Sequence, residues 1–337
     1  MPRTAHLIFN PVAGQGNPQA ELAEVRSHLE PAFDLTVYET SPDCDANALA
    51  AQAVEQGVDL VIASGGDGTI NAAAETLMET SIPLAIIPRG TANAVASALG
   101  IPSNLGEACQ VAIEGEPYVI DTARCNGRPM VLLAGVGFEA DVVERASRAA
   151  KNRFGMMAYI LAGFQQLKDL PSFEAVLETD DKVVAVQACA ITVANMAPPT
   201  SILAQGPAEV VVDDGLLDIT IVATEGIGSA LAASYELLRS ALSGEATQRD
   251  DIGFLRSKSI KITTDPPQKV VLDGEMLGEI PIEIVCVPKG LTLIVPQQPS
   301  IAKDEDIEGL PGVKVEIKGQ HRLEDVPGVE FTERKEE

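Results

Sequence analysis

The chain of 337 residues carries a formal net charge of −25 at pH 7, with five cysteines and three histidines. This length is enough for about two domains, each with a substantial core. The negative charge argues against a general nucleic-acid binder, which needs basic surface to neutralise phosphates. The cysteines form no CxxC pair and the histidines fit neither zinc nor catalytic-triad spacing, so a zinc hydrolase or a serine hydrolase has no support.

The first third of the chain alternates short apolar runs with amphipathic runs. It predicts strands over residues 5–10, 35–39, 60–63 and 84–87, and helices over 19–29, 46–56, 70–79 and 92–99. This alternation is typical of a parallel α/β sheet, whose ligand crevice lies at the carboxyl ends of the strands. The polar stretches NPVAG, ETS, GGDGT and PRGTAN each follow one predicted strand, so we expect them to meet at one site.

The pattern changes over the remainder of the chain to residue 296. Two helical stretches, over 138–167 and 227–242, interrupt segments such as KVVAVQACAITVAN, in which apolar and polar residues alternate. We therefore expect an α/β fold with an N-terminal parallel-sheet domain over 1–121 and a C-terminal antiparallel β-sandwich domain over 122–296. The acidic residues 297–337 contain a loose Pro-Gly repeat and are expected to form edge hairpins or a flexible tail.

The segment GGDGTIN, residues 65–71, leads from a strand into a helix that is expected to begin near Thr69. Gly65, Gly66 and Gly68 have no side chain that would block a ligand, so backbone N–H groups can converge on an anion there. The segment is neither a Walker A loop nor a dinucleotide fingerprint. Taken alone, it is as compatible with a structural turn as with a phosphate cradle. Asp67 would repel phosphate unless it held a metal, a metal-bound water or a proton.

The segment PRGTAN, residues 88–93, supplies a second Gly-Thr turn after the neighbouring strand. Two such turns entering adjacent helices favour phosphate binding over a purely structural role. Considered one by one, however, the side chains of Thr69, Thr91 and Asn93 are slightly better explained as helix caps.

Six motifs in order and spacing, NPVAG, GGDGTIN, PRGTAN, GVGFEADV, DDGLLDI and DGE, resemble those of the soluble bacterial diacylglycerol kinase and lipid kinase family, relatives of sphingosine and ceramide kinases. The resemblance covers residues 5–296. It implies that the parallel-sheet domain over 1–121 is the nucleotide-binding (ATP-binding) domain and that the β-rich domain over 122–296 binds lipid and metal. It implies a kinase that uses ATP and magnesium to phosphorylate a lipid hydroxyl, with diacylglycerol, giving phosphatidic acid, as the leading acceptor. Ceramide-like and other alcohols stay open as acceptors.

The same resemblance assigns roles to individual residues. Asp214 would bind a magnesium ion by its carboxylate, with the backbone carbonyls of Val211 and Leu216. Glu275 would accept the proton of the lipid hydroxyl. Asp67 would organise magnesium or its water, and Asp121 matches an acidic position that supports the same network. The nucleotide would be held by Asn10, Pro11, Val12, Ala13, Gly14, Thr40, Gly65, Gly66, Asp67, Gly68, Thr69, Ile70, Asn71 and Thr91.

Alternative interpretations accompany these assignments. Many family members carry Asp where this chain has Ala94, which removes a carboxylate from the crevice and keeps a non-catalytic nucleotide sensor open as an alternative. An NAD kinase-like enzyme shares the GGDGT turn. Asp273 and Gly274 suit a tight hairpin turn, so from the residues alone Glu275 is better explained as part of a hairpin. The DDGLLD motif is likewise compatible with a surface turn.

The stretch 144–164 suggests how the chain could reach an insoluble substrate. Four basic residues, Arg145, Arg148, Lys151 and Arg153, precede an apolar run over 154–164 that is shorter than the roughly 20 residues of a bilayer span. They could dock on anionic lipid, although a solvated helix face explains them equally well. The first predicted strand leaves no room for a signal peptide, so we expect a cytoplasmic protein that associates peripherally with membranes. The oligomeric state stays open, with a homodimer as one alternative.

Overall fold

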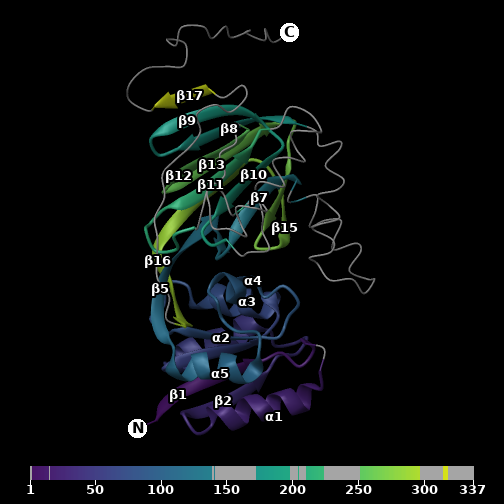
Figure 1. Ribbon diagram of the computed structural model, residues 1–337, viewed down its shortest axis with the longest axis vertical. Helices are drawn as coiled ribbons and strands as arrows, with labels where there is room; N and C mark the ends of the chain where they lie inside the picture. Colours follow the sequence, from purple (N-terminus) through teal and green to yellow (C-terminus); the bar gives the residue numbers. More distant parts are fainter. Residues whose placement is uncertain are drawn as a thin grey trace.

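The computed structural model describes residues 2–14, 16–138, 140, 172–197, 204, 210–223, 251–296 and 314–317. In this part of the chain an N-terminal α/β part and a β-rich part lie one above the other (Figure 1). Expected helices over 138–167 and 227–242, together with the basic stretch 144–164, fall outside the described residues, apart from isolated positions at their edges. Among the described helices, none is both long and apolar enough to cross a bilayer.

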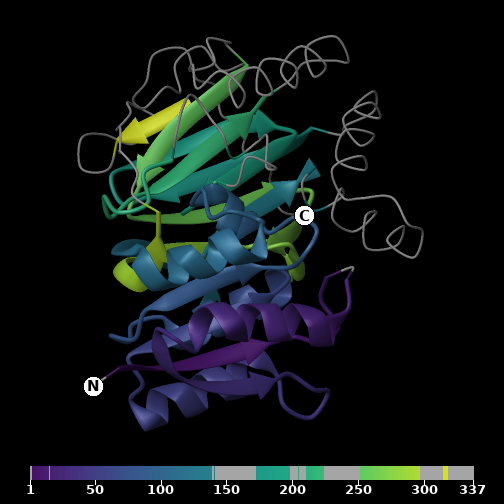
Figure 2. The ribbon, with the colours of Figure 1, turned by 60° about the horizontal axis from the view of Figure 1, so that its bottom comes forward.

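The α/β part is built on a four-stranded parallel arrangement in the order β2-β1-β3-β4. Helices cover both faces of these strands (Figure 2), and β3 and β4 are buried along their whole length, as expected for a covered parallel sheet. The elements are β1 (Arg3–Phe9), α1 (Pro18–Leu29), β2 (Phe33–Glu39), α2 (Ala46–Gln56), β3 (Leu60–Gly65), α3 (Asp67–Leu77), β4 (Leu84–Pro88), α4 (Ala94–Ala98) and α5 (Leu105–Glu114).

The four predicted strands and four predicted helices are confirmed, with shifts of up to three residues at their ends. The helix after GGDGT begins at Asp67 rather than near Thr69, so the acidic residue lies in the first turn of α3. Helix α5 has no counterpart among the predicted elements. Its local signals are nevertheless present, because Asn104 caps its start through the backbone N–H of Glu107 at 3.1 Å and Gly115 follows its end.

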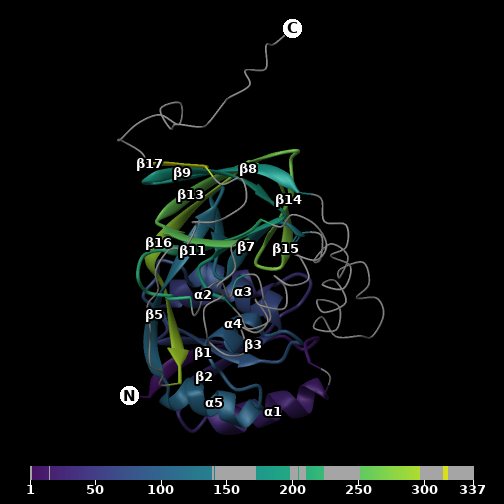
Figure 3. The same ribbon diagram turned by 45° about the horizontal axis from the view of Figure 1, so that its top comes forward.

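Two long strands connect the α/β part to the β-rich part (Figure 3). β5 (Glu116–Cys125) pairs antiparallel with β16 (Ile282–Val295) on both sides of a bulge between Val287 and Leu291. β16 pairs with β4 near its C-terminal end and with β13 (Ser259–Asp265) near its N-terminal end. One sheet of eleven strands therefore runs through both parts, and the expected boundary at residue 121 falls inside β5.

The β-rich part is an antiparallel β-sandwich, as predicted. One layer has the order β12-β11-β10-β7-β14-β15, and the other is the far end of the eleven-stranded sheet. Phe173 and Ile262 from one layer share a buried core with Ile191 and Leu255 from the other. The remaining strands are β6 (Arg128–Met130), β7 (Leu133–Gly137), β8 (Phe173–Thr179), β9 (Lys182–Ala188), β10 (Ala190–Ala194), β11 (Leu217–Val222), β12 (Ile252–Ser257), β14 (Lys269–Leu272) and β15 (Glu275–Glu279).

The acidic C-terminal residues contribute one described element. Strand β17 (Lys314–Ile317) pairs antiparallel with β9 at the edge of the eleven-stranded sheet. The other residues of the expected tail fall outside the described part of the chain, so its expected edge hairpins or flexibility stay a prediction.

Candidate functional site

The loops that follow β1, β3 and β4 meet at the carboxyl ends of the parallel strands. Gly65 at the end of β3 pairs with Pro88 at the end of β4, and the backbone N–H of Arg89 donates to the Gly65 carbonyl at 2.7 Å. The two turns that follow approach each other closely, because a Cβ on Gly90 would lie only 2.7 Å from the Cα of Gly66. Position 90 therefore requires glycine, because any side chain there would overlap the turn after β3.

The side chain of Asn10 links the loop after β1 to the turn after β3. Its Nδ2 donates to Oγ1 of Thr69 at 2.8 Å, and its Oδ1 accepts from the backbone N–H of Val12 at 3.0 Å. Thr69 is buried, whereas Val12 is 89% exposed. Thr40 follows β2, where its N–H donates to the Phe9 carbonyl at 2.9 Å. The structure thus places the residues predicted to hold nucleotide at one edge of the sheet.

Asp67 connects the two glycine turns to each other. Its carboxylate accepts from the backbone N–H groups of Asn93, at 3.0 Å, and Ala94, at 2.5 Å. These amides lie at the start of α4, where a negative charge interacts favourably with the helix dipole. The question raised by a carboxylate in this turn therefore has a structural answer, since two N–H groups of the neighbouring turn stabilise its charge.

The interpretation of three side chains as helix caps is wrong. Thr69 lies inside the first turn of α3 and accepts from Asn10, while Thr91 precedes the residue at the cap position of α4. Asn93 occupies that position but makes no side-chain cap bond. Instead, its Oδ1 accepts from the N–H of Gly90 at 2.7 Å and its Nδ2 donates to the Gly90 carbonyl at 3.0 Å, which closes the turn.

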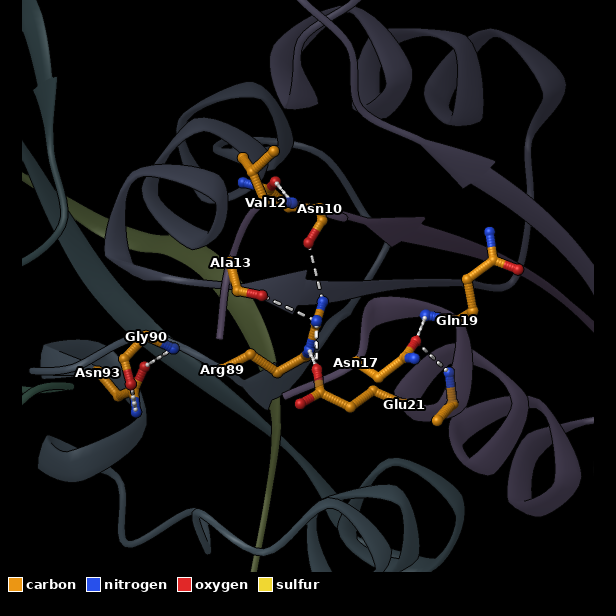
Figure 4. Close-up of polar contacts among 10 residues, drawn as sticks. Asn10, Val12, Ala13, Asn17, Gln19, Glu21, Arg89, Gly90 and Asn93 are labelled. Atoms are coloured by element: carbon orange, nitrogen blue, oxygen red, sulfur yellow. Dashed lines mark hydrogen bonds and ion pairs between the residues drawn. The ribbon is translucent and has the colours of Figure 1, made fainter. Parts of the chain in front are cut away.

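The sequence interpretation did not single out Arg89, whose guanidinium is bound to the loop after β1 (Figure 4). It donates to the carbonyl oxygens of Asn10, at 2.8 Å, and Ala13, at 2.9 Å. It also forms a hydrogen-bonded ion pair with Glu21 of α1. Its contacts reach 68 to 79 residues along the chain, so no local pattern could have found them.

A second acidic residue, Asp121, supports the loop that contains the predicted magnesium ligands. Its Oδ2 accepts from the N–H of Gly215 at 2.5 Å, and its Oδ1 accepts from the N–H of Lys289 at 2.7 Å. Its own N–H donates to the Val212 carbonyl at 2.6 Å. Asp121 is 2% exposed, and its carboxylate joins this loop to the bulge of β16.

The predicted magnesium ligand Asp214 already has a cationic neighbour. Its Oδ1 accepts from the N–H of Leu216 at 3.0 Å, and its Oδ2 forms an ion pair with Arg256, which also approaches Asp218 at 3.3 Å. Within the residues that the structure describes, no three His, Cys, Asp or Glu side chains gather in a way that could hold a metal ion. The predicted set has a different composition, one carboxylate and two backbone carbonyls.

The DGE motif forms the predicted tight hairpin between β14 and β15. Asp273 and Gly274 both have positive φ, 47° and 88°, as a two-residue type I′ turn requires. The Asp273 carboxylate accepts from three consecutive N–H groups, those of Val131, Leu132 and Leu133, at 2.7 to 3.0 Å. Burial nevertheless raises the pKa of this carboxyl to about 6.

Helix α3 joins the glycine turn to this hairpin. Its first turn contains Asp67, while Asn71 donates from Nδ2 to the Asp273 carbonyl at 3.4 Å. Glu75 lies one helical turn further on, where burial raises the pKa of its carboxyl, the charge of Arg128 partly offsets this, and the charge of Glu275 adds a smaller increase. The exposed Glu275 thus lies close to the helix that begins at GGDGT, and Figure 1 shows α3 and α4 on the side of the α/β part that faces the β-rich part.

Comparisons with known proteins agree with this arrangement. The family profile described as diacylglycerol kinase catalytic domain matches residues 4–125, and the one described as YegS C-terminal NAD kinase beta sandwich-like domain matches residues 133–295. An uncharacterized protein of Synechocystis is 46% identical over 309 residues, which cover 88% of this chain and 71% of that protein. The chain belongs to the bacterial diacylglycerol kinase-like lipid kinase family.

Further members of this lipid kinase family are similar over nearly their whole length. A diacylglycerol kinase of Bacillus subtilis is 28% identical and matches over 90% of this chain and 100% of its own. A crystal structure of a diacylglycerol kinase from Bacillus anthracis is 26% identical, has a TM-score of 0.68 and covers 87% of this chain and 97% of its own. The two-part fold described above is therefore the fold of a lipid kinase.

Proposed function

We propose that this lipid kinase transfers the γ-phosphoryl group of ATP to the hydroxyl of a lipid, with diacylglycerol as the first acceptor to test. The observation that carries the proposal is the connection made by α3. Its N-terminal turn offers backbone N–H groups suited to phosphate, and its Asn71 contacts the hairpin that presents Glu275. Relatives named diacylglycerol kinase support the choice of acceptor.

The turns after β1, β3 and β4 are suited to a nucleotide triphosphate. Gly66 occupies the cap position of α3 without any side-chain cap bond, and a Cβ on Gly68 would meet no atom of the described residues within 4 Å. The start of α3 therefore has room beside it and carries the positive end of the helix dipole. Phosphoryl transfer depends mainly on positioning and on neutralising negative charge, which such a cradle supplies.

Glu275 is the proposed general base. As the lipid hydroxyl oxygen forms a bond to the γ-phosphorus, the bond between that phosphorus and the β,γ-bridging oxygen breaks and ADP leaves. The hydroxyl proton passes to the Glu275 carboxylate, so atoms and charge balance. Glu275 is exposed at the start of β15, which leaves it accessible to an acceptor from solvent or from a lipid surface.

Magnesium is proposed at Asp214, with the carbonyls of Val211 and Leu216 as further ligands. One carboxylate and two carbonyls are hard oxygen donors, which suit magnesium when water completes its coordination shell. Bound magnesium would supply charge neutralisation. To bind the ion, the Asp214 carboxylate must either release Arg256 or contact Arg256 and magnesium at the same time.

The direct test incubates the purified protein with labelled ATP, magnesium and a panel of neutral lipids in detergent micelles. The panel contains diacylglycerol, a ceramide and a long-chain alcohol, and a separate reaction contains NAD. Label in phosphatidic acid supports the proposal, and label in another lipid corrects the acceptor alone. Label in NAD alone would replace the proposal with the NAD kinase-like alternative. ATP binding without any labelled product would favour the nucleotide sensor.

A further inference from the structure

The buried Arg89 is directed at the protein's own backbone. Its side chain is 2% exposed, and the guanidinium carbon lies 4.1 Å from the centre of the Phe9 ring. Four of its five N–H donors have acceptors, namely the carbonyls of Asn10 and Ala13 and, through two donors, the carboxylate of Glu21. A guanidinium engaged in this way is not available as a direct phosphate ligand.

The bond from Arg89 to Ala13 orients the next peptide group of the loop. In a trans peptide the C=O of one residue and the N–H of the next point in opposite directions. Because the Ala13 carbonyl is turned toward Arg89, the N–H of Gly14 is turned away from it. Gly14 has a φ of 87°, which only glycine adopts readily, and a Cβ there would lie 3.2 Å from Oε2 of Glu21.

Glu21 completes the same arrangement from α1. Its side chain is 20% exposed and holds the Arg89 guanidinium through two donors. A Cβ on Gly16 would overlap Oε1 of Glu21, so Gly16 also lies directly against this carboxylate. The turn after β4 is thus linked to the loop after β1 and to α1, which lie 68 to 79 residues earlier in the sequence, through the hydrogen bonds and the ion pair of Arg89 (Figure 4).

We propose that Arg89 is a positioning residue for the nucleotide: together with Glu21 it fixes the loop of residues 10–14 so that the N–H of Gly14 faces the phosphates. This inference rests on the proposed function, because it takes ATP as the ligand of that loop. Arg89 acts through the backbone of the loop and touches no phosphate itself. The planar fork of arginine suits this task, since a lysine ammonium cannot bind two carbonyls and a carboxylate in one plane.

The test replaces the ion pair without leaving a buried charge. In the double variant Arg89→Met/Glu21→Met, apolar side chains of similar length take the place of the pair, a change that folded proteins often tolerate. The matched control is Arg26→Met/Glu30→Met, which removes an exposed pair at the C-terminal end of α1, the helix that contains Glu21; its side chains are 52% and 47% exposed. Arg89→Lys forms the third variant, because it keeps the charge opposite Glu21.

Two measurements are made on each variant and on the wild type. Without nucleotide, amide hydrogen exchange over residues 10–17 should be faster in the Arg89→Met/Glu21→Met variant than in the wild type or the control. With nucleotide, the Kd and KM for ATP should rise about tenfold or more, the size expected for losing hydrogen bonds to a charged group, while kcat changes by less than about threefold. Arg89→Lys should fold normally and still bind ATP about tenfold more weakly.

The outcomes separate this inference from the proposed function. A wild type that fails to bind ATP would overturn the proposed function. It would also overturn the inference that Arg89 positions the loop for ATP. A wild type that binds ATP, with equal affinity and equal exchange in both double variants, would overturn the inference alone. Full ATP affinity in Arg89→Lys would also overturn it, because charge without the fork would then suffice.

Discussion

Oδ1 of Asp67 lies 2.5 Å from the backbone nitrogen of Ala94, and through this contact the turn after β3 holds the turn after β4. Many relatives were expected to carry a carboxylate at position 94, yet here the residue contributes its N–H group. The carboxylate of Asp67 therefore stabilises the start of α4. Both turns belong to the proposed nucleotide crevice, so a change in Asp67 affects its shape as well as its charge.

Asp67→Asn tests that dual role. The amide Nδ2 would face a backbone N–H, so one hydrogen bond is lost and the charge near α4 disappears. We expect most of the kinase turnover to be lost, while stability falls by about 1 kcal/mol, the usual effect of losing a helix-cap interaction. The protein stays folded, which circular dichroism and the melting temperature check.

A matched control for this variant is Asp59→Asn. Asp59 also accepts from a backbone N–H, that of Thr4 at 2.7 Å, but it precedes β3, at the edge of the sheet away from the site. Its variant should keep normal turnover. Near-normal turnover in Asp67→Asn, or equal losses in the two variants, would contradict the role assigned to Asp67.

Asp273 predicts a pH dependence of stability. Its folded-state pKa of about 6 lies above the ordinary aspartate value of 3.8, so between pH 4 and 6 the folded protein binds more protons than the unfolded chain. The free energy of unfolding should therefore fall as pH rises through this window, by up to about 3 kcal/mol for a shift of about two units. Thermal unfolding of the wild type and Asp273→Asn at pH 4, 5, 6 and 7 measures it.

The informative quantity is the difference in stability between these two proteins. The asparagine does not titrate, so the wild type should lose stability relative to Asp273→Asn from pH 4 to 7. A difference that stays constant, or that grows in favour of the wild type as pH rises, contradicts the raised pKa.

Asp214 predicts a magnesium-dependent change in stability. If the carboxylate binds the ion, magnesium at about 100 times its Kd should stabilise the wild type by about 2.7 kcal/mol, seen as a higher melting temperature. Asp214→Asn should remove this increase. Arg256→Gln should enlarge it, because the ion pair that competes for the carboxylate is gone.

The neighbouring Asp213 supplies the control, since its carboxylate lies near Tyr118. Burial first, and then Asp213, raise the pKa of that phenol to about 12. Asp213→Asn should keep the full magnesium effect. If Asp214→Asn responds to magnesium as the wild type does, the proposed site is wrong.

The basic residues 145, 148, 151 and 153 predict membrane binding, although they lie outside the described part of the chain. Each basic residue near an anionic surface contributes about 1 kcal/mol. Replacing Arg145, Arg148, Lys151 and Arg153 with Gln should weaken sedimentation with phosphatidylglycerol vesicles and activity on vesicle-borne lipid. Activity on a short-chain, soluble diacylglycerol should survive. Unchanged vesicle binding would leave the stretch as ordinary surface.

Local sequence patterns predicted the parallel strands, the sandwich and the DGE hairpin, because burial periodicity and turn residues act over a few positions. Glycines likewise indicated the turns after β3 and β4, which the structure brings close together. The partners of Arg89 and the three N–H groups that bind Asp273 could not be predicted, since they lie 68 to 79 and 140 to 142 residues away in the sequence. Their contacts exist only once the sheet has assembled.

The start of α3 shows a smaller limit of the same kind. Gly-Asp-Gly-Thr offers several positions at which a helix can begin, and the sequence favoured Thr69. In the structure α3 begins two residues earlier, at Asp67, whose carboxylate accepts from the amides of Asn93 and Ala94. These partners lie 26 and 27 residues away in the sequence, so the local pattern does not contain them.

Glu275→Gln tests most directly the central claim that the glycine turns and the β14–β15 hairpin form one active site. The wild type, this variant and Glu279→Gln, a control on the same exposed strand, are assayed for phosphoryl transfer from ATP to diacylglycerol, for ATP affinity and for melting temperature. The account predicts a loss of turnover of about 10²–10⁴ in Glu275→Gln alone, with unchanged ATP affinity and melting temperature. A lower melting temperature with normal turnover of the folded protein would contradict it and leave Glu275 as a hairpin residue.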